Sequence, residues 1–385
     1  MSKKTLRCVL STAAVLVTAF AARQFAFAGE QVHSGTQALS SIANQNFDGS
    51  LQGVVPANVT ASPSAAVPPA QPAVALTREP AFPFKSVQKS ASDPILTPAV
   101  TDETSFESNG AFNPAVILKD GVFNMLYRAQ DRHATSTIGL AVSKDGVHFT
   151  KRPEPVIVPD QDYEKPGGCE DPRIVKVGDT FYVTYTGYSP AGTPSCIATS
   201  KDLIHWEKHG QILPRKSSAI LNVQVNGKYW LYFGDTNIWA ATSSDMIHWT
   251  QIDEPVLKPR DGSWDDSLVE SGPPPIMTKQ GILLIYNGNL SEGRSRDLGR
   301  QKGRDQVRQY STGWALFDKN DPTKLIARSG SPWLTVTEPW EVYGQVGDVV
   351  FTEGMVLKGG KAYMYYGGAD TTVNVAIAEP AWDAP

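Results

Sequence analysis

Short runs of alternating apolar and polar residues dominate the chain from about residue 91, and no convincing helical period interrupts them. The runs come in pairs around a turn, and three pairs are followed by a turn of the form D-x-x-x-[FW]. Related segments of this kind occur at 127–151, 185–208, 232–251, 286–327 and 365–379. Repeats of roughly 50 to 60 residues, each built from several short strands, are typical of a radial β architecture. The pattern therefore predicts an all-β fold, a five-bladed β-propeller.

A second repeated element, an apolar segment rich in proline, ends four of the five units. It lies at 155–159, 211–214, 255–259 and 332–336. The fifth unit has no such segment after it, whereas a matching one, P-I-L-T-P, occurs early at 94–98. We therefore expect an N-terminal strand to complete the last blade, which closes the ring and removes an exposed edge.

The first 90 residues have a different composition. Lys3, Lys4 and Arg7 precede a short apolar run, and an A-x-A signal ends at residue 28, which together predict a secretory signal peptide at 1–28. The apolar run is too short to cross a bilayer, and no later segment is apolar enough to do so. Residues 29–90, rich in Ala, Pro, Ser and Gln, predict a flexible linker before a propeller domain at 91–385. We expect a soluble protein that is secreted or periplasmic.

Charge and cysteine content narrow the function classes. The formal net charge of −4 argues against nucleic acid as the main partner. After signal cleavage only Cys169 and Cys196 remain; they fit no metal-binding motif, and whether they pair stays open. The sequence predicts no metal or other cofactor and gives no indication of the oligomeric state.

In a propeller the first strand of each blade lines the central channel, and its start faces the funnel where ligands bind. Five sequences mark these starts: Asn113-Pro114, Glu170-Asp171-Pro172, Ser218-Ala219, Ser271-Gly272-Pro273 and Thr352-Glu353-Gly354. We expect Asp171 to face this funnel; alternatively, Asp171 and Arg173 form a buried pair that braces the ring. Several acids and aromatic rings around a funnel suit a carbohydrate, and cleaving a glycosidic bond needs a carboxylic acid and a second group.

These residues also carry a resemblance. The stretch from F-N-P-A-V-I-L through G-C-E-D-P-R-I-V-K-V to I-A-T-S-K-D-L-I-H-W resembles glycoside hydrolase family 130, the β-mannoside phosphorylases and β-mannosidases. G-P-P-P-I-M, D-P-T-K-L-I-A-R-S, V-F-T-E-G-M-V and Y-Y-G-G-A-D-T extend the likeness over nearly all of 91–385. The family fold is a five-bladed propeller, which agrees with the count of repeats.

The resemblance implies roles for particular residues. Asp171 of D-P-R matches the general acid, which delivers its proton through a hydroxyl of the bound sugar. Asn113, Arg128, Asp131 and Asp370 match residues that contact the terminal sugar. Turn capping is the alternative role for Asp131 and Asp370, and an ion pair with an acid of the funnel is the alternative for Arg128. Arg173, Asp235, Tyr286 and Asn287 complete the expected substrate-binding set.

The chain departs from the family where its phosphorylases hold phosphate. Val223 and Gln224 replace a basic pair, Gly234 lies near an arginine position, and Asn287 replaces a histidine. A phosphate site needs cations or a donor-rich backbone nest, so this loss favours hydrolysis. Arg215 and Lys216 lie nearby but out of register. A water would then need a base, for which Glu270 and Glu353 rank above Asp235.

The sequence thus predicts an exported glycoside hydrolase that cleaves β-mannosides or a related glycan, with inversion, acting on an oligosaccharide or polysaccharide. Three alternatives stay open: a phosphorylase with a rearranged phosphate site, a furanosidase- or arabinanase-like propeller, and a carbohydrate-binding propeller without catalysis. The basic loop at 291–309 is either a solvated loop or a lid over the funnel. The sugar, the linkage and exo or endo action are not predicted.

Overall fold

A computed structural model describes residues 82–290 and 309–382 of the chain. The predicted signal peptide, the linker up to residue 81 and nearly all of the 291–309 loop lie outside these residues. The described part is all-β, as predicted, with only two short helical segments, η1 (Asp162–Glu164) and α1 (Pro339–Val342). Neither has the length or the run of apolar residues that a membrane-crossing helix requires.

The strands form five groups, which we call units 1 to 5 in the order of their first long strands. One large sheet holds unit 1 (β2 Gly110–Lys119, β3 Val122–Gln130, β4 Ser136–Ser143, β5 Thr150–Lys151) and unit 2 (β6 Gly168–Val177, β7 Thr180–Tyr188, β8 Ser195–Ser200, β9 Glu207–Leu213). A single parallel bridge between Ser136 and Gly168 joins the two units. Within each unit neighbouring strands are antiparallel.

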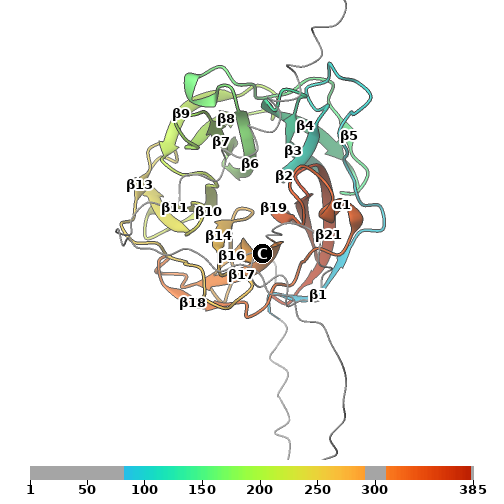
Figure 1. Ribbon diagram of the computed structural model, residues 1–385. Helices are drawn as coiled ribbons and strands as arrows, with labels where there is room; N and C mark the ends of the chain where they lie inside the picture. The colour runs from blue at the N-terminus through green and yellow to red at the C-terminus, as the bar shows by residue number, and fades with distance from the viewer. Residues whose placement is uncertain (1–81, 291–308, 383–385) are drawn as a thin grey trace, which may run out of the picture. The chain divides into compact units, whose positions relative to one another are not determined.

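Three further sheets hold the remaining units. Unit 3 consists of β10 Ala219–Val225, β11 Lys228–Phe233, β12 Trp239–Ser243 and β13 Thr250–Gln251. Unit 4 consists of β14 Leu268–Ser271, β15 Ile276–Met277, β16 Ile282–Leu290, β17 Gln309–Phe317 and β18 Leu325–Arg328. Unit 5 consists of β19 Val350–Lys358, β20 Lys361–Gly368, β21 Thr372–Pro380 and β1 Phe84–Lys89. Strands β2, β6, β10, β14 and β19 lie innermost around a common centre (Figure 1).

The N-terminal strand differs from the one predicted. Strand β1, blue in Figure 1, pairs with the last strand, β21, and Gln88 lies opposite Ile377. The predicted segment, 94–98, makes only an isolated bridge from Leu96 to Val373. The folded part therefore begins before the predicted boundary at residue 91. Because three of the six side chains of β1 are exposed, its sequence, F-K-S-V-Q-K, lacks the apolar pattern that marks the other strands.

A buried ionic cluster recurs in four units and explains how β1 is held. In each, a tyrosine and a cation bind one acid, and the cation comes from the outermost strand. The clusters are Tyr127–Glu107–Lys151, Tyr185–Glu164–Lys208, Tyr286–Asp265–Arg328 and Tyr366–Glu341–Lys89. In unit 5 the Lys89 Nζ lies 2.6 Å from Glu341 Oε1, and the Glu341 side chain is fully buried. Lys89 thus takes the position of the outer-strand cation of the other units.

We expect Lys89→Met to lower the stability of the domain, because it leaves the buried Glu341 carboxylate without its cation. Breaking a buried ion pair from one side typically costs about 3–5 kcal/mol, so the melting temperature should fall clearly. Lys85→Met, at an exposed position of the same strand, is the matched control. Equal melting temperatures for the two variants would show that β1 is not needed to complete unit 5.

Candidate active site

Irregular pairing at the start of three inner strands turns side chains toward the centre. The register shifts between Phe112 and Pro114 in β2, between Glu170 and Arg173 in β6, and between Thr352 and Gly354 in β19. Such β-bulges change the direction of a side chain and are frequent beside active sites. Asn113 and Asp171 have φ values of 47° and 50°, a conformation that Asn and Asp tolerate better than most residues. These bulges give Asn113, Asp171 and Glu353 their positions.

Asp171 lies in a dense polar cluster formed by units 1 and 2. Its Oδ1 accepts hydrogen bonds from Asn113 Nδ2 at 2.8 Å and from an Arg128 guanidinium nitrogen at 3.2 Å. The same guanidinium donates to Glu170 Oε1 at 2.5 Å and lies over the Phe112 ring, 4.7 Å from its centre. Both carboxyl groups are buried. Arg128 therefore joins the two neighbouring acids, which matches the ion pair that we weighed as its alternative role.

The three acids of this region differ in protonation. Burial raises the pKa of Glu170 to about 7, against the opposing effect of Arg128. Burial alone would also raise the pKa of Asp171, but Arg128 and Lys216 outweigh it and lower this pKa to about 2. Burial raises the pKa of Asp370 to about 6. Near neutral pH Asp171 is thus ionised. Glu170 and Asp370 have pKa values closer to neutral, so each is protonated in part of the molecules.

Glu270, at β14 in unit 4, belongs to a second cluster. Its Oε1 lies 2.9 Å from Lys216 Nζ and accepts a short hydrogen bond from Ser217 Oγ, whereas no described residue donates to Oε2. Burial lowers the pKa of Lys216, but the charges of Glu270, Asp171 and Asp235 outweigh it and raise this pKa well above its ordinary value. Because Lys216 interacts with both Asp171 and Glu270, the two clusters belong to one site.

Arg173 and Glu353 are the most deeply buried charged pair of the site. The guanidinium donates to the carbonyl oxygens of Asp171, Ser271 and Gly272, and one of its nitrogens lies 2.9 Å from Glu353 Oε1. That nitrogen is directed at Ser271, so neither Glu353 oxygen accepts a well-aligned hydrogen bond from a described residue. Burial raises the pKa of Glu353 well above its ordinary value. Arg173 therefore braces the inner strands, though through Glu353 and backbone carbonyls rather than through the Asp171 carboxylate.

Two predicted substrate-binding residues serve other purposes. The Tyr286 hydroxyl donates to Asp265, and its ring stacks on Trp264, so it belongs to the ionic cluster of unit 4. The Asn287 side chain donates to the Thr352 carbonyl and accepts from the Thr352 amide and the Thr312 hydroxyl. It thereby links unit 4 to unit 5. Both side chains therefore pack between strands, and their contact with a substrate stays a prediction.

The other predicted residues lie around the rim. Asp131 caps its own turn, since Oδ1 accepts from the backbone amides of His133 and Thr135. Asp370 is partly buried in the turn between β20 and β21, where the charge of Arg128 lowers its pKa against the larger effect of burial. Asp235 is partly buried beside Lys216. The site therefore brings together Asn113, Arg128, Asp171, Arg173, Asp235, Glu270, Glu353 and Asp370.

Sequence reasoning missed Glu170, Ser217 and the position of Lys216. Glu170 stands next to Asp171, so adjacency was the available signal. Lys216 was judged out of register, but its long side chain reaches Glu270 from the connection before β10. The expectation that the region had lost its cations is thus corrected: one lysine is present, and it is paired with an acid. Cys169 and Cys196 are buried free thiols.

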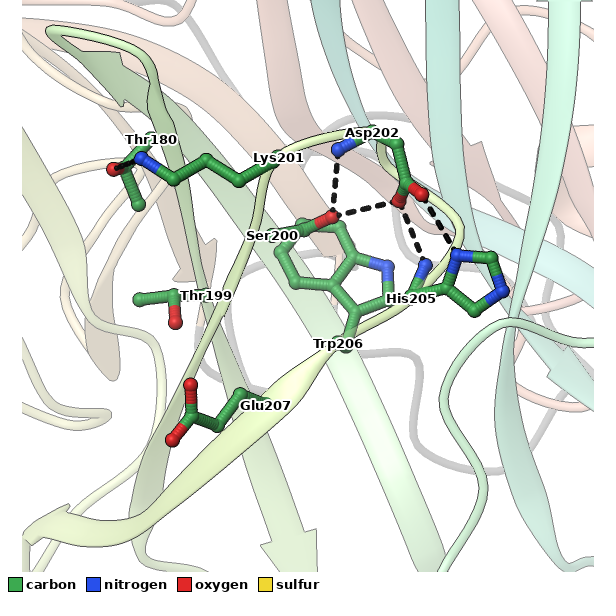
Figure 2. A pocket seen from close by; sticks show the side chains of 8 residues that line it. All are labelled: Thr180, Thr199, Ser200, Lys201, Asp202, His205, Trp206 and Glu207. Atoms are coloured by element: carbon green, nitrogen blue, oxygen red, sulfur yellow. Dashed lines mark hydrogen bonds and ion pairs between the residues drawn. The ribbon is translucent and has the colours of Figure 1, made fainter.

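A surface groove with a volume of about 400 Å³ lies elsewhere, in unit 2 (Figure 2). Asp202 accepts from the backbone amides of Ile204 and His205 and pairs with the His205 ring, so the turn satisfies its own polar groups. Asp145 and Asp245 make the same bonds in units 1 and 3. The turn that borders this groove therefore recurs in three units as a structural element, and the groove is separate from the acidic site described above.

Comparisons with known proteins identify the family of this chain. The model of the Glyco_hydro_130 family, described as beta-1,4-mannooligosaccharide phosphorylase, matches residues 88–380. A 1,2-beta-oligomannan phosphorylase from Thermoanaerobacter sp. strain X514 is 37% identical over 306 residues, which cover 76% of this chain and 97% of the relative.

Two solved structures are similar throughout the described part. One was published with the statement that the GH130 family of mannoside phosphorylases contains glycoside hydrolases that target beta-1,2 mannosidic linkages in Candida mannan. It is 36% identical, has a TM-score of 0.72 and covers 80% of this chain and 98% of its own. The other, the beta-1,2-mannobiose phosphorylase from Listeria innocua in complex with beta-1,2-mannobiose, is 26% identical. Its TM-score is 0.66, and the match covers 76% of this chain and 97% of that one.

Proposed function

Because the chain belongs to glycoside hydrolase family 130, we propose that it is a hydrolase of β-mannosides, with β-1,2-linked mannosides as its first candidate substrates. The charge pattern of the site carries this proposal. Six carboxyl groups (Glu170, Asp171, Asp235, Glu270, Glu353 and Asp370) surround three cations, Arg128, Arg173 and Lys216. Each of these cations is already paired with an acid. To bind any of these three, a phosphate dianion would have to displace an acid, whereas water needs no cation.

In this proposal Asp171 is the general acid and Glu270 the general base. An acid needs a proton, and Glu170, with a pKa of about 7, holds one beside Asp171 through part of the neutral range. A sugar hydroxyl bound at Asp171 completes the route of the proton to the glycosidic oxygen. Asn113, Arg128 and Asp370 surround this sugar. The buried Oδ1 of Asn113 has no partner among the described residues and can accept a bond from a sugar hydroxyl.

Glu270 suits the base because Lys216 and Ser217 hold Oε1 and leave Oε2 without a described donor. A water bound at Oε2 would attack the anomeric carbon from the face opposite the leaving group, which inverts its configuration. Glu353 suits this role less well, because burial raises its pKa and so disfavours the ionised form that a base needs. Asp235 is the third candidate.

Phosphorolysis is the second candidate function. Two observations favour it: the relatives named above are phosphorylases, and Lys216 brings a cation into the site. Against it, Lys216 is paired with Glu270, and the predicted phosphate positions hold Val223, Gln224 and Gly234. The furanosidase-like and non-catalytic readings gain no support from these relatives.

We also propose that units 1 to 5 are the blades of a five-bladed propeller that β1 closes. The pairing of β1 with β21 and the shared role of Lys89 support this closure. Export by the predicted signal peptide, to the periplasm or beyond the cell, remains part of the proposal. Export fits hydrolysis, because a phosphorylase would leave a charged sugar phosphate outside the cytoplasm.

The reaction class can be tested with β-1,2-mannobiose in ¹⁸O-labelled water, with and without added phosphate. We expect free mannose in both cases, a rate that does not increase with phosphate, and one ¹⁸O atom in the mannose released from the non-reducing end. Mannose 1-phosphate as the main product, formed only when phosphate is present, would establish a phosphorylase instead. A β-1,4-linked mannobiose serves as the control for linkage.

A further inference from the structure

One arginine near the site, Arg215, has no hydrogen-bond acceptor among the described residues. The Arg215 guanidinium lies over the Trp239 ring, with its carbon 4.8 Å from the ring centre, and both side chains are partly buried. No described residue accepts a hydrogen bond from it. In contrast, Arg128, Arg173, Arg260 and Arg328 all bind acids or carbonyl groups. Stacking on the indole holds the planar group in one orientation and leaves its N–H edges available.

The backbone around Arg215 is fixed. The Arg215 carbonyl accepts bonds from the amide and the hydroxyl of Ser195, at 3.1 and 2.7 Å. The Lys216 carbonyl accepts from the Gly234 amide at 2.8 Å, which fastens the turn before β12 to the segment that carries Arg215. A Cβ at Gly234 would lie 3.7 Å from Arg215 Cδ, and the next residue, Asp235, acts on Lys216, so the Arg215 side chain lies on the Asp235 side of the active site.

Gly234 makes room for the pair. Its φ is +108°, and a Cβ there would lie 2.6 Å from the Asn237 carbonyl oxygen and 3.0 Å from Trp239 Cδ1. Any larger residue would therefore push Trp239 away and disturb the surface on which Arg215 rests. The contact between Arg215 and Trp239 thus depends also on Gly234, in the turn before β12.

The position of the pair suggests which part of a substrate it meets. The residues proposed to hold the terminal sugar come from β2, β3 and the turn after β20. Arg215 precedes β10 and Trp239 begins β12, and β10 lies across the centre from β2 (Figure 1). A glycan that places its scissile bond between Asp171 and Glu270 would extend its leaving-group side toward unit 3.

We infer that Arg215, stacked on Trp239, is a leaving-group subsite that binds a neutral sugar ring through two adjacent hydroxyl groups. The guanidinium donates two parallel N–H bonds, and the sugar hydroxyl oxygens accept them. A neutral sugar fits better than an anionic one, because the acids Asp235 and Glu270 balance the charges of Arg215 and Lys216 and leave no net positive charge there. This inference rests on the proposed function, since it assumes a mannoside in the site.

The test measures binding to full-length protein carrying Asp171→Asn, which prevents turnover whichever reaction class applies. Calorimetry with β-1,2-mannobiose, β-1,2-mannotriose and methyl β-mannoside is compared with and without Arg215→Met. Methionine keeps apolar contact with Trp239 but donates no hydrogen bond. We expect the two oligosaccharides to bind about 10-fold more weakly, which corresponds to about 1.4 kcal/mol, because water replaces the lost donors in part. Methyl β-mannoside should bind as before.

Arg132→Met is the matched control, because Arg132 is an exposed arginine of unit 1 that already pairs with Glu103. It should change none of the affinities. Unchanged oligosaccharide binding in Arg215→Met would overturn the inference, as would an effect confined to carboxylated or phosphorylated glycans. Failure of all three mannosides to bind even without Arg215→Met would instead count against the mannoside-hydrolase proposal, and the subsite would fall with it.

Discussion

Asp171→Asn is expected to reduce kcat on β-mannobiose by about 10²–10⁴-fold, the usual contribution of general acid catalysis. Asparagine has the shape of aspartate, and its side-chain oxygen can still accept bonds from Asn113 and Arg128. It cannot pass a proton to the leaving oxygen. The loss should therefore appear in kcat, measured by release of mannose, while the affinity for the glycan changes much less.

A substrate with a good leaving group separates the acid role from a structural one. An aryl β-mannoside whose phenolate leaves without protonation should retain most of its rate in Asp171→Asn. The matched control is Asp179→Asn, an exposed acid in the turn between β6 and β7, which should behave as the wild type. Near-normal turnover of mannobiose by Asp171→Asn would remove the acid assignment. A large fall in melting temperature would indicate that Asp171 braces the fold.

The inner-strand starts could be predicted from the sequence because their signals are local. Asn113, Asp171 and Glu353 each stand just before proline or glycine at the beginning of an apolar strand. Bulges at these places need residues that tolerate an irregular backbone, and they turn the side chain out of the regular alternation of a strand. The residue pattern therefore carried both the fold class and the position of three polar side chains.

Strand β1 could not be found in this way. It pairs with β21 near the other end of the chain, and only one of its six side chains is buried. Its one strong signal is Lys89, which corresponds to the outer-strand cations Lys151 and Lys208. The same comparison accounts for Tyr286, which we expected to bind substrate. Like its counterparts Tyr127 and Tyr185, it binds a buried acid. Repeats should therefore be compared for polar partners as well as for apolar positions.

The pairing of charges across the site depended on tertiary structure. Lys216 and Glu270 are 54 positions apart, and only the packing of unit 3 against unit 4 brings them to 2.9 Å. Burial then separates acids that look alike in the sequence, since it raises the pKa of Glu170 and Glu353 while Arg128 keeps Asp171 ionised. Local sequence cannot supply these differences, because both the partners and the depth of burial come from distant strands.

Glu270→Gln is expected to lower kcat on β-mannobiose by about 10²–10⁴-fold, because the amide cannot take a proton from the attacking water. Glu353→Gln is the discriminating comparison. Burial raises the pKa of Glu353 well above its ordinary value and so disfavours the ionised form that a base needs, and glutamine has nearly the same shape. It should change kcat several-fold at most. Both rates are measured on the same substrate, by release of mannose.

Loss of Glu270 also leaves Lys216 without its acid, so a structural effect must be separated from a catalytic one. Glu270→Ala with added azide makes this separation. Azide needs no base, and attack on a β-mannoside from the side of the missing carboxylate would form α-mannosyl azide, the product of inversion. Recovery of rate with that product would assign Glu270 as the base and define the stereochemistry in one measurement. If azide rescues Glu353→Ala but not Glu270→Ala, the roles are exchanged, and Glu353 must lose its proton when the glycan binds.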